Sequence, residues 1–335
     1  MSAKGDILAY LTAKGHEGIL QSELYRLNYS RSTIVEAIES LEKEKKVIRK
    51  EIGKKAYRIW LVEEAPFPIE GVLRLGLLRA VEYPHAILTA KDLEREYDVR
   101  ILVYNSAIEL TNALALGKVD LACSPLITQV LFGLLTKNLR IAGGCGFGGS
   151  GVVLKGDLKE GIKIGSSELS TMETMLKLFL EKHGLVDKAK VIYFKKPEEI
   201  VKSFLEGEID ALSIWEPYLS SLEKEGFKVY RYVELFGLYP CCALGVNYEF
   251  FKINKEIFYK FMDYYKKNTK SLKQRKEEAI RLMEMVFGFK QEQIRNGFEG
   301  FVYDYRLSKE QVESALERFG LKVFNLDPLL LPKDF

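Results

Sequence analysis

The residues of this chain that could do chemistry point to binding rather than to catalysis. The loop before Met172 is rich in hydroxyl groups and opens a predicted helix, whose first N–H groups attract an anionic or acceptor-rich group. Trp215 and Tyr218 offer aromatic surface to a planar or apolar ligand, and Glu216 between them could accept a hydrogen bond from an amino group. No nucleophile stands at a convincing spacing from a base. We therefore expect a protein that binds a small molecule and is not an enzyme.

The cysteines argue against a disulfide framework and against a zinc module. The four of them, Cys123, Cys145, Cys241 and Cys242, lack C-x-x-C spacing, and the chain has only three histidines. Cys241 and Cys242 are interpreted as small buried side chains of a strand. We therefore predict no metal and no cofactor.

Composition and charge are those of an ordinary globular protein. The 335 residues are enough for two or three domains, with 47% hydrophobic and 29% charged residues. The net charge of +3 is too small to indicate a polyanionic partner for the whole chain, so any nucleic-acid signal must be local. The sequence begins without an apolar stretch and small-residue cleavage site, and it contains no run of about 18 apolar residues. These features predict a cytoplasmic protein with no membrane partner.

One short sequence motif occurs twice and predicts how the polar residues are positioned. Residues 113–126 and 203–218 each contain the end of an amphipathic helix, a glycine, an aspartate three residues later and an apolar strand that runs to a proline. Gly117 and Gly207 suit the left-handed position that follows a helix, and Asp120 and Asp210 open the strands. Because the two copies lie far apart in the chain, the repeated unit is a whole α/β lobe, and ligands of such folds bind beyond the strand ends. We expect two lobes with a cleft between them.

The first 65 residues form a different pattern. Predicted helices at 6–13, 19–27 and within 30–47 are followed by two strands around a Gly53-Lys54-Lys55 turn, and eight basic residues lie between Lys43 and Arg58 against two acidic ones. This order resembles a winged helix-turn-helix domain of transcription regulators, an α+β fold. The resemblance implies contacts with double-stranded DNA from these side chains: Ser30, Arg31, Ser32, Thr33, Arg49, Lys50, Lys54, Lys55 and Arg58. The alternative is that the basic run is a solvated surface and that the winged helix only mediates dimerisation.

From about residue 70 to 335, strands and helices alternate. Two helix starts have capping-box spacing, Ser106 with Glu109 and Ser170 with Glu173. The motifs Tyr83-Pro84-His85, GKVD, GEID, IWEPYL and CCALGVNYEF, in this order, resemble the type II periplasmic-binding-protein family, in the branch of sulfonate binders and thiamin-pyrimidine synthases. That resemblance implies a two-lobed α/β domain. Lobe one would comprise about 70–144 and 240–335, and lobe two about 151–235.

The same resemblance implies which residues face the ligand. They would be strand-end residues of both lobes: Glu82, Tyr83, His85, Asn105, Ser124, Ser166, Ser167, Ser170, Thr171, Trp215, Glu216 and Tyr218. Ser106 and Ser170 are equally well explained as helix caps, and Trp215 as a core residue.

The synthase activity of that branch does not carry over to this chain. Those enzymes have a longer cysteine cluster that holds iron at the position of Cys241 and Cys242, and a lysine and a histidine where Ser124 and Thr128 stand here. Both essential residue types are therefore missing.

Together these patterns predict a cytoplasmic transcription regulator. It would bind DNA as a homodimer through its winged helix, and an anionic or pyrimidine-like ligand in the cleft would control it. The competing hypotheses are a pyrimidine-synthase-like enzyme with a fused regulatory domain and a winged helix that recruits a protein partner. The identity of the ligand does not follow from the sequence.

Overall fold

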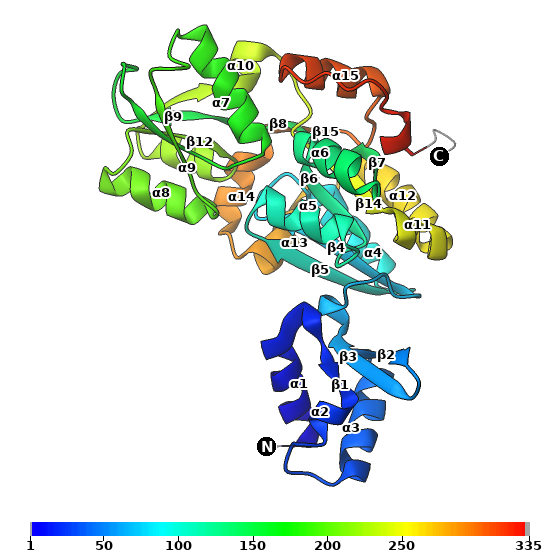
Figure 1. The fold of residues 1–335 in the computed structure, drawn as a ribbon. Coiled ribbons are helices and arrows are strands. Elements are labelled where there is room, and N and C mark those ends of the chain that lie inside the picture. Colours follow the sequence, from blue (N-terminus) through cyan, green and yellow to red (C-terminus); the bar gives the residue numbers. More distant parts are fainter. Residues whose placement is uncertain (1, 332–335) are drawn as a thin grey trace. The chain divides into compact units, whose positions relative to one another are not determined.

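The computed structural model describes residues 2–331, whose contacts divide into two units (Figure 1). The first comprises residues up to Ile69 together with Leu116–Lys118, and the second comprises Glu70–Ala115 and the chain from Val119 onward. Each unit has its own hydrophobic core. Among residues 2–331, no helix is long and apolar enough to cross a bilayer.

The N-terminal unit contains three helices and one antiparallel sheet with the strand order β1-β3-β2. Ile7, Leu11, Ile34, Ile38 and Leu41 are fully buried between the helices and the sheet. The elements are α1 (Ala3–Lys14), β1 (Ile19–Leu20), α2 (Gln21–Leu24), α3 (Arg31–Lys43), β2 (Val47–Gly53) and β3 (Ala56–Leu61).

One predicted helix of this unit is largely wrong. The helix expected over residues 19–27 is replaced by strand β1 and the single turn α2, because the first two residues pair with β3 as Ile19 with Ile59 and Leu20 with Arg58. Sheet pairing here overrides a helical sequence pattern.

Lobe one of the second unit is built on a five-stranded sheet with the order β5-β4-β6-β14-β7. Strands β4, β5 and β6 are parallel, and β14 runs antiparallel to both of its neighbours. The strands are β4 (Val72–Leu78), β5 (Asp98–Tyr104), β6 (Leu121–Pro125), β7 (Leu139–Gly144) and β14 (Cys242–Asn247). The helices between them are α4 (Pro84–Leu93), α5 (Ala107–Ala115) and α6 (Leu126–Thr136).

Lobe two repeats this topology in a sheet with the order β11-β10-β12-β9-β13. Strand β9 takes the place of β14, antiparallel to β12 and β13. The strands are β9 (Ser150–Leu154), β10 (Lys163–Ser166), β11 (Lys190–Tyr193), β12 (Ala211–Trp215) and β13 (Lys228–Arg231), and the helices are α7 (Thr171–Lys182), α8 (Pro197–Glu206), α9 (Tyr218–Lys224) and α10 (Tyr232–Phe236).

The C-terminal part is mainly helical, and it also supplies β15 (Phe301–Tyr303), which pairs with β8 (Gly146–Gly148). Its helices are α11 (Tyr248–Ile253), α12 (Lys255–Lys270), α13 (Lys276–Phe287), α14 (Gln291–Phe298) and α15 (Lys309–Arg318).

The repeated sequence motif, at residues 113–126 and 203–218, forms the same local structure in both lobes. Gly117 and Gly207 have φ angles of 72° and 84°, the left-handed region that glycine adopts without strain. Asp120 and Asp210 then bind the first residues of the neighbouring strand, because their carboxylates accept the N–H of Arg74 at 2.7 Å and of Lys163 at 2.9 Å. Each turn therefore ties the central strand of its lobe, β6 or β12, to the adjacent strand, β4 or β10.

Candidate functional site

A small cavity of about 30 Å³ lies between the two lobes. It is lined by residues of lobe one, of lobe two and of the strand that returns to lobe one: Leu78, Ala80, Glu82, Tyr83, Asn105, Ser106, Ala107, Pro125, Ser167, Ser170, Thr171, Met172, Trp215, Cys241 and Cys242.

The fold brings most of these residues together at the carboxyl ends of parallel strands. Glu82 and Tyr83 follow β4, Asn105 follows β5, and Ser167 follows β10. Carboxyl ends of parallel strands share one edge of a sheet, and the two sheets present these edges to the cavity. Seven of the twelve residues expected at the ligand line it, namely Glu82, Tyr83, Asn105, Ser167, Ser170, Thr171 and Trp215.

The hydroxyl groups at the start of α7 are held by one another and by the helix. The Ser167 and Ser170 Oγ atoms lie 2.8 Å apart, and Ser170 Oγ also accepts the N–H of Glu173. Thr171 Oγ1 donates to the carbonyl of Cys241 at 2.8 Å, which joins lobe two to the returning strand. Ser170 is thus a helix cap that also borders the cavity, so both of its sequence interpretations describe its position.

Glu82 is the buried acidic group of the cavity. Its side chain is 1% exposed and its Oε1 accepts the N–H of Cys242 at 2.9 Å. Burial raises the pKa of Glu82 from 4.5 to about 8, against the lowering effect of its hydrogen bonds with Cys242. The Tyr83 hydroxyl lies 3.3 Å from Cys242 Sγ, and burial raises its pKa as well. Glu82 can therefore donate a hydrogen bond to a ligand at neutral pH.

Glu82, Cys241 and Cys242 also form a group that could hold a metal ion. One carboxylate oxygen and the two sulfur atoms all lie within 4.8 Å of one another. Two thiolates and a carboxylate suit zinc with a fourth position left for a ligand from the cavity. Both thiols and the carboxyl would have to lose their protons first, and burial holds the pKa of Glu82 and Cys242 above their ordinary values. The absence of a metal stays a prediction.

Two expected ligand residues of lobe one lie outside the cavity lining. His85 Nε2 lies 2.8 Å from the Tyr265 hydroxyl, and burial lowers the pKa of His85 to about 3, so the imidazole is neutral. Ser124 Oγ accepts hydrogen bonds from Thr111 and from Gln129, both at 3.0 Å. These contacts hold lobe one together.

Three expected residues of lobe two also lie outside the lining. Ser166 is fully buried beside the strand end. Glu216 accepts the Arg231 guanidinium at 2.9 Å, and the Tyr218 hydroxyl donates to Glu198 at 2.6 Å. Glu216 and Tyr218 therefore form contacts within lobe two, and of these neighbouring residues only Trp215 lines the cavity.

Sequence reasoning missed several lining residues. Met172 was not among the residues expected at the ligand, and Cys241 and Cys242 were interpreted as small buried side chains of a strand, yet all three border the cavity. The sequence signal was present for Met172, because it directly follows the hydroxyl-rich loop. The two cysteines carry no such signal, since only the return of the chain to lobe one brings them opposite Glu82.

Hydrogen bonds close the lobes over the cavity. Trp215 Nε1 donates to the carbonyl of Arg79 at 3.0 Å, and Thr128 Oγ1 donates to the carbonyl of Leu169 at 2.5 Å. An ion pair of 2.9 Å joins Arg79 to Glu198. Each of these contacts joins lobe one to lobe two, so the lobes are held together beside the cavity and leave only a small space between them.

In the N-terminal unit, the basic residues expected to face DNA are largely engaged within the unit. Arg49 forms an ion pair with Glu42 at 3.1 Å, and the Lys50 ammonium lies 4.4 Å from the centre of the Phe67 ring. Arg58 donates to the carbonyl of Glu17 at 3.1 Å. Of these three side chains, only Arg49 has its charge neutralised by a carboxylate, while Lys50 and Arg58 contact an aromatic ring and a backbone carbonyl.

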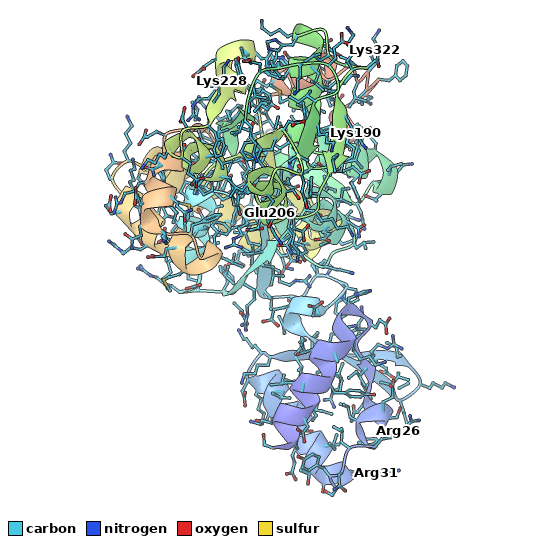
Figure 2. The ribbon with its side chains drawn as sticks, turned by 90° about the vertical axis from the view of Figure 1, so that its left-hand side faces the viewer. Arg26, Arg31, Lys190, Glu206, Lys228 and Lys322 are labelled. Atoms are coloured by element: carbon cyan, nitrogen blue, oxygen red, sulfur yellow. The ribbon has the colours of Figure 1, made fainter. Side chains whose placement is uncertain are left out.

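The residues of α3 that were expected to contact DNA also form contacts within the N-terminal unit. Ser30 caps α3 by accepting the N–H of Thr33, and its Oγ lies 2.8 Å from that of Ser32. The Arg31 guanidinium lies over the Tyr25 ring, and Figure 2 shows this arginine at the end of the unit. Lys54 and Lys55 occupy the exposed turn between β2 and β3.

Comparisons with known proteins identify the two-lobed unit. The model of the NMT1-like family matches residues 72–286, more than half of the chain. No curated protein sequence matches the chain.

Solved structures with the same fold cover most of the chain. The ligand-binding component of an ABC-type import system from Staphylococcus aureus, with zinc bound, has a TM-score of 0.68 and 17% identity over 78% of this chain and 97% of its own. The alkanesulfonate-binding protein of Xanthomonas axonopodis pv. citri, bound to MOPS, has a TM-score of 0.63 and 19% identity over 75% and 91%. The periplasmic nitrate-binding protein of Synechocystis PCC 6803 has a TM-score of 0.61 and 17% identity over 73% and 75%. The predicted two-lobed periplasmic-binding-protein-like fold is confirmed.

These findings correct the functional prediction. Several proteins of similar fold are solute-binding proteins, one of them a component of an import system, which contradicts the expected transcription regulator and its double-stranded DNA partner. Two of the similar structures, the aliphatic sulphonate-binding protein of Escherichia coli and the nitrate-binding protein, are periplasmic, which also contradicts the expected cytoplasmic location. The prediction that the chain is not an enzyme is confirmed, because these relatives bind solutes. The error came from giving weight to a basic hairpin, because a run of basic residues does not by itself distinguish a DNA-binding surface from a solvated one.

Proposed function

This chain belongs to the NMT1-like family, and from that premise we propose that it is the solute-binding component of an import system, which takes up a small organic molecule between its lobes. The carrying observation is the cavity between the lobes, which is lined by residues that follow strands of both sheets. The solute-binding function of the proteins of similar fold supports the proposal.

We propose that the ligand has an apolar or planar body and at least one hydrogen-bond acceptor. Trp215 and Met172 offer the body a contact surface, and protonated Glu82 can donate to the acceptor. Among the described residues that line the cavity there is no lysine, arginine or histidine. A small inorganic anion such as nitrate would therefore find no cationic partner, and an organic ligand fits better.

We also propose a winged helix-turn-helix architecture for the N-terminal unit. Its three helices and its β1-β3-β2 sheet with the exposed turn at Lys54 and Lys55 support this description. This proposal concerns its fold alone.

The experiment uses the two tryptophans of the chain, Trp60 and Trp215. We would titrate the full-length protein with alkanesulfonates, aminopyrimidines and nitrate, and measure tryptophan fluorescence and the melting temperature. A ligand of the cavity should change the fluorescence of the Trp60→Phe variant, which keeps Trp215, and leave that of Trp215→Phe unchanged. A response that persists in Trp215→Phe and disappears in Trp60→Phe would place binding outside the cavity. If no organic probe changes either signal, the proposal fails.

A further inference from the structure

A pair of cysteines lies in the core of lobe one, apart from the cavity. Cys123 Sγ and Cys145 Sγ are 2.8 Å apart, and both residues are fully buried. Cys123 lies in β6, and Cys145 directly follows β7. The sheet order β6-β14-β7 places strand β14 between these two strands, so the contact joins two segments on either side of the returning strand.

The surroundings hold one member of the pair in place. Tyr265 lies against Cys145, with its hydroxyl 3.2 Å from the sulfur, and the N–H of Cys145 donates to the carbonyl of Cys242 at 3.2 Å. A disulfide needs a sulfur–sulfur distance of about 2.0 Å, so the two atoms have to approach by less than roughly 1 Å.

We propose that Cys123 and Cys145 form an intramolecular disulfide when the chain folds in an oxidising medium. Two thiols are oxidised and a low-molecular-weight disulfide is reduced. One cysteine thiolate attacks the small disulfide and releases one small thiolate, and the second cysteine thiolate then attacks the protein sulfur of the mixed disulfide and releases the other. The two protons of the cysteines end on the two small thiols.

Burial decides when this reaction takes place. In the folded protein neither sulfur is accessible to an oxidant or a reductant, so the bond forms before the core of lobe one closes and then persists until the protein unfolds. The bond closes a loop between positions 22 residues apart, which contains α6 and β7. By restricting the unfolded chain, it should raise the melting temperature by several degrees.

Cys241 and Cys242 should remain thiols. Their side chains border the cavity together with Glu82, and they lie next to one another in the chain. They provide an internal reference, since the oxidised protein should contain two free thiols and the reduced protein four.

The test refolds the full-length, reduced and denatured protein in glutathione disulfide with glutathione, or in dithiothreitol. After denaturation, alkylation with iodoacetamide and mass spectrometry count the free thiols, and a non-reducing peptide map identifies the linked pair. We expect two alkyl groups after refolding in glutathione, a single peptide pair containing Cys123 and Cys145, and resistance to dithiothreitol until urea is added. Cys241→Ala should keep the bond, and Cys145→Ser should lose it.

Two results would overturn the proposal. One is four alkylated cysteines in folded protein recovered from the glutathione buffer. The other is a peptide map that links Cys241 or Cys242 in place of this pair. Both measurements are made on the natural sequence, so they do not depend on whether Cys145→Ser folds.

Discussion

The two copies of the aspartate turn should differ strongly in their contribution to stability. Asp120 and Asp210 occupy equivalent places, and each accepts a backbone N–H of the neighbouring strand. Asp120 also binds the Arg74 guanidinium, through Nε at 3.0 Å and Nη2 at 2.9 Å, and both side chains are 0% exposed. Asp210 is only partly buried and has the backbone of Lys163 as its partner.

The expected magnitudes follow from these contacts. Asp120→Asn removes the negative charge and directs an NH2 group at Arg74, which leaves a buried cation uncompensated and costs about 3–5 kcal/mol. Asp210→Asn keeps an oxygen acceptor for a single hydrogen bond, so its cost is about 0.5–1.5 kcal/mol. The double variant Arg74→Met with Asp120→Leu removes both charges and should be far more stable than Asp120→Asn.

Urea denaturation, followed by far-ultraviolet circular dichroism, measures the free energies of unfolding of the unchanged full-length protein and of the three variants. Equal losses for the two single variants would refute the reasoning, because they would show that the ion pair of Asp120 adds nothing to the shared turn. A double variant as unstable as Asp120→Asn would show that packing, and not charge, is decisive.

Three further predictions concern the cavity and the connection between the lobes. Because burial raises the pKa of Glu82 to about 8, the folded protein keeps a proton that the unfolded chain loses above its ordinary pKa of 4.5. The free energy of unfolding should therefore fall between about pH 5 and pH 8. In thermal melts of metal-free protein, Glu82→Gln should lessen this fall by at most about 5 kcal/mol. Equal pH slopes in both proteins would contradict this. Thr128→Val removes a hydrogen bond between the lobes and should weaken ligand binding by roughly 2- to 10-fold in the fluorescence titration, and unchanged affinity would exclude a role in closure. Gly149→Ala places a Cβ 2.0 Å from the Phe301 ring, at a φ of 73°. Gly161→Ala is the control, because its Cβ meets no atom within 4 Å at a similar φ. Gly149→Ala should lower the melting temperature clearly more than the control, and equal losses would assign the effect to φ alone.

Much of the fold could be predicted because its signals are local. The glycine and aspartate of each turn, the caps Ser106 and Ser170, and the apolar strands all follow from short-range patterns. The helix predicted over residues 19–27 failed because its first residues pair with β3, a partner that lies about 40 residues away.

The candidate site was predictable where residues lie in the loop that follows a strand. Glu82, Asn105 and Ser167 were expected at the cavity for this reason, and they line it. Glu216 and Tyr218 have the same kind of position but turn to Arg231 and Glu198, and no sequence spacing distinguishes the two outcomes.

The sequence by itself determined that the chain contains two similar lobes, because the repeated turn is encoded in a few consecutive residues. Only the tertiary structure decided what each copy does. Arg74 lies 46 residues before Asp120, and its burial beside that aspartate turns one copy into an ion pair, while the other copy keeps a single backbone partner. Likewise, Cys241 and Cys242 meet Glu82 only because the chain returns from lobe two, and contacts between residues about 160 positions apart depend on the packing of the whole unit.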